Sequence, residues 1–533
     1  MKAALPGLLA LAALLIVPFA LRPASLAEPD GDERLVVLTP HNEAIRFEMA
    51  RGFARYRAAR GEPVVHIDWR SPGGTTEISR FLVSEYRSAF ENYFALQTGQ
   101  TLSERGAQAF ANAKQSTHGD DDAARARRAF LGSNVGIKLD LLFGGGSYEF
   151  SQHAEAGRLV DSGLRQRRPE LFGGGDRAIP QRVGGEPYWD EAGRWVGTCV
   201  SGFGICYNPE ALTRLGITRA PKRWDDLADP RLAGHLALAD PSKSGSANKA
   251  FEMLIQQQMG EMLARRGTPA RGSAAESAAL AEGFDAGLRL VRRIGSGARY
   301  FTDQAGKVVQ DIQSGSAAAG MCIDFYGRFE SDTPGPGQRL RFVQPEGGTS
   351  MGADPIGLLR GAPNVAQAHS FLDFVLSEQG QALFAYKRGV PGGPERYALR
   401  RSPILPILFE PSRAHLRSDP DDNPYEAARA FTYHGSWTGP LFRALSFVIR
   451  VMCVDTEVEL HEAAAALAEN GNPPGALAAF DDMSLVSYAV VKGEIAPVLA
   501  SADPLREVAL QNRLVKAMKQ HYEQVTLLAR QRQ

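Results

Sequence analysis

Three short loops rich in glycine and serine each follow an apolar, strand-like segment and lead directly into a helical pattern. They span residues 71–77, 144–147 and 242–246. The first backbone N–H groups of a helix have no partner inside the helix, and the helix dipole makes that end positive. Each loop is therefore a candidate anion-binding site that needs no catalytic residue. A plain turn that starts a helix explains the loop at 71–77 almost as well.

Strand and helix patterns alternate along most of the chain. Apolar segments at 35–38, 64–69 and 137–143 each precede residues with apolar side chains at helical spacing, and a second such unit runs from about 196 to 330. This alternation predicts an α/β fold with parallel sheets covered by helices. In such sheets the ligand binds beyond the carboxyl ends of the strands, where the loops collect.

Two regions fall outside this alternation. Residues 88–129 are polar and rich in Gln and Arg, which predicts an inserted, partly helical excursion with a solvated charged face. Residues 401–533 are rich in Ala and mostly helical in pattern, which predicts a C-terminal extension. The sequence assigns no chemistry to either region.

Length and charge narrow the class of protein. A chain of 533 residues predicts more than one domain. The 60 Lys and Arg residues balance 60 Asp and Glu residues. A nucleic-acid-binding protein is expected to carry a basic surplus, so we expect no nucleic-acid partner.

The N-terminal residues have the pattern of an export signal. Lys2 precedes an apolar run from Ala3 to Leu21, and small residues follow at 25–27. This pattern predicts a cleaved signal peptide over residues 1–27. The run is also nearly long enough to span a bilayer as a retained anchor. In both cases the rest of the chain is expected to be periplasmic or otherwise outside the cytoplasm.

Four cysteines are too few and too scattered for a disulfide scaffold: Cys199, Cys206, Cys322 and Cys453. We expect buried thiols that pack as small apolar groups. A single Cys199–Cys206 bridge is the alternative in an oxidising compartment.

The segment from Trp224 to Gly245 carries a long ordered pattern. It reads Trp-x-Asp-Leu-x-Asp-Pro, then a Gly, an apolar strand, and Asp-Pro-x-x-Ser-Gly. This pattern resembles the family 1 extracellular solute-binding proteins, the receptors of ABC importers, in the group that includes ferric-iron binders. The resemblance covers roughly residues 34–400.

The resemblance implies a type II periplasmic-binding-protein fold with a ligand cleft between two lobes. Lobe 1 is expected over 34–147 and 340–400, and lobe 2 over 148–339, with crossovers near 197–201 and 330–343. Receptors of this family are exported, bind a small-molecule solute and work with an ABC permease in the inner membrane. We expect a monomer and no cofactor.

The candidate site gathers the loops and two further positions. The residues expected to contact the solute are His41, Gly73, Gly74, Thr75, Thr76, Gly145, Gly146, Ser147, Ser244, Gly245, Ser246, Asp324 and Tyr326. His41 follows the first strand, where Asn42 is also a candidate helix cap. Asp324 is either a hydrogen-bond acceptor for the solute or the cap of the helix that follows it.

The iron receptors that the chain resembles place a His at the position of His41 and a Tyr pair at 325–326. Here Phe325 replaces one Tyr, and Gly145 or Gly146 stands where an acidic ligand is expected. Iron binding through His41 and Tyr326 is the alternative. Loops with glycines and hydroxyls at helix starts suit a phosphate, phosphonate or carboxylate better.

The sequence therefore predicts an exported receptor for a small organic anion. No His-Glu-x-x-His pair occurs in the sequence, and we expect no enzymatic activity. The alternative from another class is an exported sensory or interaction protein that kept the fold and docks through its C-terminal helices.

Overall fold

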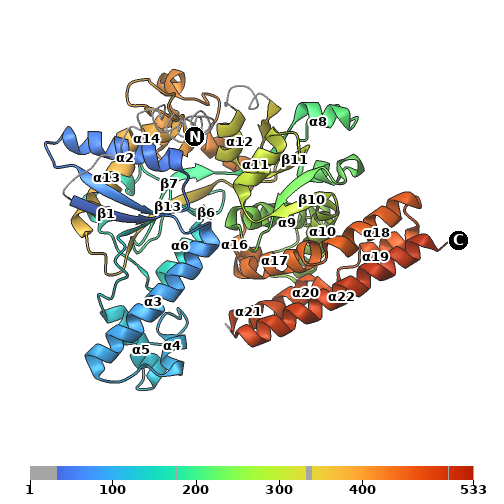
Figure 1. The fold of residues 1–533 in the computed structure, drawn as a ribbon, viewed down its shortest axis with the longest axis horizontal. Coiled ribbons are helices and arrows are strands. Elements are labelled where there is room, and N and C mark those ends of the chain that lie inside the picture. The colour runs from blue at the N-terminus through green and yellow to red at the C-terminus, as the bar shows by residue number, and fades with distance from the viewer. Residues whose placement is uncertain (1–32, 176, 332–338, 502, 532–533) are drawn as a thin grey trace, which may run out of the picture.

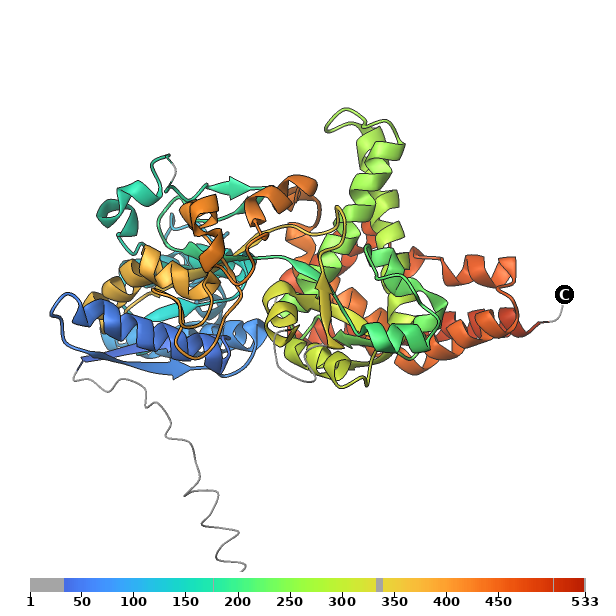
Figure 2. The ribbon, with the colours of Figure 1, turned by 90° about the horizontal axis from the view of Figure 1, so that it is seen from above.

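Two separate β-sheets divide the α/β part of the chain into two lobes that lie side by side (Figure 1). The computed structural model describes residues 33–175, 177–331, 339–501 and 503–531. The predicted signal peptide or anchor at 1–27 lies outside these residues. A layer of C-terminal helices packs against the second lobe, as Figures 1 and 2 show. The architecture is the predicted two-lobed α/β fold with a helical C-terminal region.

Lobe 1 contains a seven-stranded sheet in the order β14-β7-β13-β3-β1-β2, with β4 paired to β13. β1 is parallel to both β2 and β3, so their carboxyl ends lie at one edge. The strands are β1 (Glu33–Leu38), β2 (Val65–Arg70), β3 (Leu141–Phe143), β4 (Leu159–Val160), β7 (Val196–Ser201), β13 (Gly352–Leu359) and β14 (Ser402–Pro403). The covering helices are α2 (Glu43–Ala58), α6 (Ser147–Ala156), α7 (Leu164–Arg167), α13 (Val365–Val375) and α14 (Glu378–Ala385). A small hairpin, β5 (Arg182–Val183) and β6 (Glu186–Pro187), precedes β7.

The predicted insertion at 88–129 is a helical arm. α3 (Thr75–Thr98) runs through residue 88 without a break, and α4 (Glu104–Ala109) and α5 (Asp122–Gly132) fold back beside its far end (Figure 1). Phe90, Phe110 and Phe130 pack together there, with ring centroids 4.8–5.2 Å apart. These rings belong to a hydrophobic cluster that continues into lobe 1 and includes Leu38 and Leu142.

Lobe 2 contains a five-stranded sheet in the order β10-β9-β11-β8-β12. β9 is parallel to β10 and β11, whereas β8 runs antiparallel to β11 and β12. The strands are β8 (Phe203–Tyr207), β9 (Leu236–Ala239), β10 (Ala298–Thr302), β11 (Ala319–Ile323) and β12 (Arg341–Val343). The helices are α8 (Pro209–Arg214), α9 (Gly245–Arg265), α10 (Ala274–Ser296), α11 (Ala305–Gln313) and α12 (Asp324–Ser331).

The chain crosses between the lobes at two predicted places and at one further place. β7 passes into β8 at residue 202, close to the predicted crossover. The return lies between β12 and β13, at 344–351, slightly later than predicted. Residues 148–201, which the sequence places in lobe 2, contribute β4 and β7 to the sheet of lobe 1. This boundary depends on which strands pair with one another, and the sequence alone does not show the pairing.

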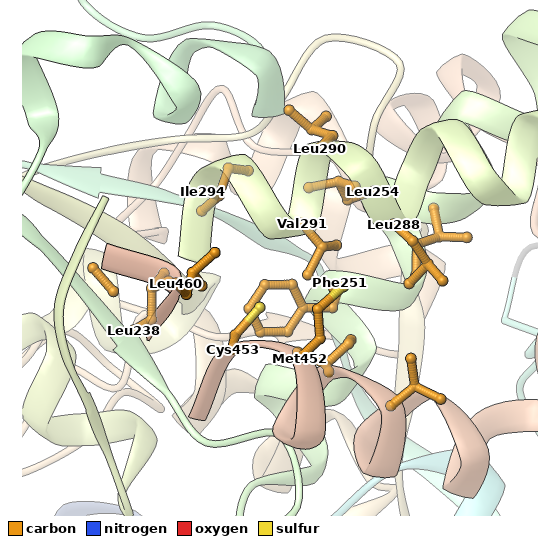
Figure 3. Packing of buried hydrophobic residues seen from close by; sticks show 14 of the residues in the cluster. Leu238, Phe251, Leu254, Leu288, Leu290, Val291, Ile294, Met452, Cys453 and Leu460 are labelled. Atoms are coloured by element: carbon orange, nitrogen blue, oxygen red, sulfur yellow. The ribbon is translucent and has the colours of Figure 1, made fainter. Parts of the chain in front are cut away.

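After β14 the chain stays packed on lobe 1 up to Ala428, and the third crossing follows there, before Phe431 joins the core of lobe 2. The helices after β14 are α15 (Pro424–Ala427), α16 (Gly435–Thr438), α17 (Phe442–Ile449), α18 (Glu457–Glu469), α19 (Pro474–Phe480), α20 (Tyr488–Val490), α21 (Ala496–Ala500) and α22 (Pro504–Arg530). Met452, Cys453 and Leu460 pack against apolar side chains of α9 and α10, including Phe251 and Val291 (Figure 3). From about residue 431 the extension shares one hydrophobic core with lobe 2.

Two helical stretches of this region have the length and apolar composition of membrane spans. They are Gly435–Val454 and Pro474–Ala500. Just over half of the first stretch, 56%, is buried inside the protein, against 28% of the second. The core of Figure 3 explains the apolar character of the first stretch.

Candidate ligand-binding cleft

The N-termini of three helices meet where lobe 1 faces lobe 2. α3 and α6 come from lobe 1, and α9 comes from lobe 2. A Cβ atom placed on Gly245 would lie 2.5 Å from Thr75 Oγ1 and 3.0 Å from Glu149 Oε1. A Cβ atom on Gly145 would lie 3.2 Å from Thr75 Cγ2. The structure thus brings together the three loops that the sequence singled out, at 73–76, 145–147 and 244–246.

The first turns of these helices carry backbone donors that lack a partner inside the helix. Gly74 and Gly146 occupy the cap positions of α3 and α6, and glycine has no side chain with which to cap them. Ser244 caps α9 by accepting a hydrogen bond from Ala247 N at 3.2 Å, and its Oγ lies 3.1 Å from Ser246 Oγ. Three positive helix ends from two lobes therefore point to one small region.

Glu149 lies among these helix ends, in the first turn of α6. Its Oε2 would be 2.7 Å from a Cβ atom on Gly146. The side chain keeps some exposed surface although protein surrounds its carboxyl group. Burial raises the pKa of Glu149 to about 7. The sequence analysis missed this residue; its position two residues after Ser147, on the exposed first turn of the helix, was the available signal.

His41 belongs to a buried ionic cluster beneath the loop at 144–146. Its Nε2 lies 3.3 Å from Asp354 Oδ2 and 3.1 Å from Arg401 Nη1. Arg401 also forms an ion pair with Asp354, whose Oδ1 accepts a hydrogen bond from Gly145 N at 2.5 Å. Gly144 has φ 93° and faces the His41 ring, which a Cβ atom would meet at 2.5 Å.

The surroundings shift the pKa values of Asp354 and His41 in this cluster. Burial alone would raise the pKa of Asp354, but Arg401 and His41 outweigh it and hold that pKa well below its usual range. Burial lowers the pKa of His41, although Asp354 opposes the change. His41 thus has its polar partners inside the protein, below the loops. Sequence reasoning missed Asp354 and Arg401 because they lie more than 300 residues further along the chain.

Asp324 and Tyr326 lie at the connection between the lobes. Asp324 Oδ2 accepts a hydrogen bond from Gly202 N at 3.0 Å, and Oδ1 accepts one from Phe325 N at 2.7 Å. Burial raises the pKa of Asp324. Tyr326 contacts Phe325, with ring centroids 4.3 Å apart, and burial raises its pKa too. Asp324, the first residue of α12, therefore connects the crossover at Gly202 to the start of that helix.

A second ionic cluster joins both lobes and the C-terminal region. Lys249 Nζ of α9 lies 3.0 Å from Glu186 Oε1 of lobe 1 and 2.9 Å from Glu252 Oε2. It also lies 3.6 Å from the centre of the Tyr433 ring. Burial alone would lower the pKa of Lys249, but Glu186 and Glu252 outweigh it and raise that pKa. Near the same helix end, Tyr148 of α6 contacts Phe442 of α17 at 4.6 Å between ring centroids.

The structure also shows the state of the four cysteines and tests for clusters of metal-binding side chains. All four cysteines are buried and free, as the preferred interpretation expected, so the Cys199–Cys206 bridge is not formed. Among the described residues, no group of three or more His, Cys, Asp or Glu side chains is arranged to hold a metal ion. In the iron alternative, His41 would have to leave its contacts with Asp354 and Arg401 to coordinate a metal.

Residues 174–402 match the family model described as bacterial extracellular solute-binding protein. An uncharacterized protein of Haemophilus influenzae is 30% identical over 190 residues, which are 36% of this chain and 46% of that relative. The phosphoglycerate transport regulatory protein PgtC of Salmonella typhimurium is 25% identical over 191 residues, which are 36% of this chain and 40% of PgtC. The chain thus spans less than half the length of these relatives.

Solved structures of similar proteins include periplasmic binding protein AfuA from Actinobacillus pleuropneumoniae, with exogenous fructose-6-phosphate bound. It is 18% identical, with a TM-score of 0.46, and the match covers 70% of this chain and 86% of AfuA. Iron-bound HitA from Pseudomonas aeruginosa is 13% identical, with a TM-score of 0.48, and the match covers 78% and 99%. The match to the bacterial extracellular solute-binding proteins thus covers residues 174–402, which are less than half of the chain.

Proposed function

We propose that the protein is an exported receptor that captures a small organic anion between its lobes and delivers it to an ABC permease. The observation that carries this proposal is the meeting of three helix N-termini from both lobes around Thr75, Gly146 and Gly245. Backbone N–H groups and helix dipoles bind phosphate, phosphonate or carboxylate groups without a cationic side chain.

The arrangement also supplies a means of signalling that the solute is bound. A solute held by donors from both lobes stabilises the state in which the lobes are in contact, and a permease can recognise that state. The match of residues 174–402 to the model of bacterial extracellular solute-binding proteins supports the receptor role, a location outside the cytoplasm and the permease as partner. The name of the Salmonella relative, which refers to phosphoglycerate transport, favours a phosphorylated solute.

A thermal-shift screen followed by calorimetry tests the proposal. The screen contains 3-phosphoglycerate, sugar phosphates, phosphonates, carboxylates, ferric ion and uncharged sugars. A ligand that binds only the folded protein raises the melting temperature, so we expect shifts with phosphorylated or carboxylated compounds. Binding of ferric ion, with a visible charge-transfer band that Tyr326→Phe abolishes, would establish the iron alternative. No shift with any compound would favour the interaction protein.

A further inference from the structure

The carboxyl group of Glu149 lies between the N-termini of two of the three helices. Oε2 is directed at the cap of its own helix, where a Cβ atom on Gly146 would lie 2.7 Å away. Oε1 is directed at lobe 2, where a Cβ atom on Gly245 would lie 3.0 Å away. The carboxyl group is therefore within reach of any anion that binds at these helix ends.

The neighbouring charges do not neutralise an ionised Glu149. Lys249 is the cation that acts on it from α9, but the Nζ of Lys249 is already held by Glu186 and Glu252. Glu252 acts on Glu149 as a like charge. With Glu149 ionised, this group of four side chains, which includes Glu186 and Glu252, would carry three negative charges and one positive charge.

An anionic solute adds at least one more negative charge to this region. Two like charges in a partly desolvated site raise the proton affinity of the weaker acid. A protonated carboxyl group can also donate a hydrogen bond to the anion, whereas a carboxylate can only repel it. The protonated form of Glu149 is thus the one compatible with an anion at the helix ends.

We propose that Glu149 binds the anionic group of the solute as a neutral carboxylic acid, so that capture of the solute is coupled to uptake of one proton by this residue. This inference rests on the proposed function. The proton comes from solvent and moves onto a carboxylate oxygen of Glu149, which then donates it in a hydrogen bond to the solute. The raised pKa of the free protein, about 7, places the coupling in a physiological range.

The linkage has a definite sign. Above pH 7 the free protein carries an ionised Glu149, so binding must take up a proton and affinity falls as pH rises. Uptake of one proton corresponds to an association constant that falls about tenfold per pH unit. A phosphate monoester has a second pKa of about 6, so it stays mostly a dianion between pH 7 and 9. The solute's own titration therefore contributes little in that range.

Isothermal titration calorimetry measures the coupling directly. The probe is 3-phosphoglycerate, or the tightest-binding phosphorylated compound of the screen, at pH 7, 8 and 9 in buffers with different ionisation enthalpies. The heat then gives the number of protons taken up per solute. Wild-type protein should take up close to one proton per solute at pH 8, and Glu149→Gln should take up none. The matched control is Glu155→Gln, at an exposed position of the same helix. This control should take up the same number of protons as the wild-type protein.

Each outcome separates this inference from the receptor function. Binding with no proton uptake by wild-type protein would overturn the role of Glu149 and leave the receptor intact, as would uptake that Glu149→Gln does not change. Tighter binding at higher pH would also overturn it, since an ionised Glu149 would then accept hydrogen bonds from the solute. No binding of any anion at any pH would overturn the proposed function itself. If Glu149→Gln does not fold, the wild-type profile still decides whether binding takes up a proton, and its absence would overturn the inference.

Discussion

Gly245 of lobe 2 faces Thr75 of lobe 1 so closely that a Cβ atom on the glycine would lie 2.5 Å from the threonine Oγ1. Thr75 opens helix α3 and Gly245 opens helix α9. The two residues belong to different lobes and are 170 positions apart, so their approach depends on how the lobes meet. It also makes Gly245 a sensitive probe of lobe contact.

Gly245→Ala should weaken solute binding without unfolding the protein. The added methyl group would collide with Thr75 Oγ1 and Glu149 Oε1, so the lobes could not approach as closely. Calorimetry with the best anion of the screen should show affinity reduced by at least about tenfold, the equivalent of about 1.4 kcal/mol.

Gly260→Ala is the matched control in the same helix. Among the described residues, no atom lies within 4 Å of a Cβ atom placed on Gly260. Alanine favours the helix interior over glycine by about 1 kcal/mol, so the control should bind normally and melt slightly higher. Normal binding by Gly245→Ala would contradict the placement of the site.

Ser244→Ala should lower the free energy of unfolding of lobe 2 by about 1 kcal/mol, the typical value of a lost helix cap. Ser244 Oγ accepts the hydrogen bond from Ala247 N, whereas Ser246 has no such role at the cap. Urea unfolding of the two single variants checks this difference. A larger loss for Ser246→Ala would show that Ser244 is not the cap.

Glu149→Gln should stabilise the protein at alkaline pH and much less at acid pH. The pKa of Glu149 is raised from 4.5 to about 7 in the folded protein. A carboxyl group with a raised pKa contributes stability that is full below its unfolded pKa and is lost as pH rises through its folded pKa. Stability due to this group is therefore lost between about pH 4.5 and 7.

Melting temperatures of the wild-type protein and Glu149→Gln at pH 5 and pH 8 measure this effect without any solute. The gain from the substitution should be larger at pH 8. Glu155→Gln should show no such difference. An equal gain at both pH values would mean that Glu149 titrates normally.

Asp354→Ala should destabilise the protein by about 3–5 kcal/mol, because it leaves Arg401 as an uncompensated buried charge. The Arg401 side chain is fully buried (0% exposed), and Asp354 is its ion-pair partner. The double variant Asp354→Asn, Arg401→Met should recover part of the loss. Chemical denaturation compares the three proteins.

The exposed pair Arg87–Glu91 on α3 is the control for this comparison, with side chains 56% and 41% exposed. Removing it should change stability by less than about 0.5 kcal/mol. A similarly small effect for Asp354→Ala would show that Arg401 finds another partner or reaches solvent.

The sequence predicted the loops of the candidate site better than the side chains that surround them. A strand that ends in Gly or Ser and passes into a helix is a local pattern, so 73–76, 145–147 and 244–246 were identifiable one by one. Topology also predicted that the first two lie at one edge of a sheet, because they follow parallel strands. The third follows β9 in the other sheet and meets them only where the lobes meet. Glu149 escaped notice because a Glu in a first helical turn is common and carries no distinctive spacing.

The roles expected for His41 and Asp324 show that local sequence patterns do not predict the contacts of a side chain. Both residues follow strands, as expected for site residues, but His41 Nε2 contacts Asp354 and Arg401, and Asp324 Oδ2 accepts a hydrogen bond from Gly202 N. These partners come from other strands and from the far end of the α/β region. Only packing decides whether a polar side chain at a strand end faces the cleft or the interior.

The sequence by itself determined the α/β alternation, the helical character of the C-terminal region and the three loops rich in glycine and serine, because periodicity, glycine placement and helix starts are encoded within a few neighbouring residues. The two-lobed arrangement was an expectation from the family resemblance. Tertiary structure alone decided that residues 148–201 join lobe 1, that the C-terminal helices share the core of lobe 2, and that Glu149 lies between two helix ends. Strand pairing, core sharing and the electrostatic environment of a carboxyl group depend on residues hundreds of positions apart. They become visible only when the folded chain brings those residues into contact.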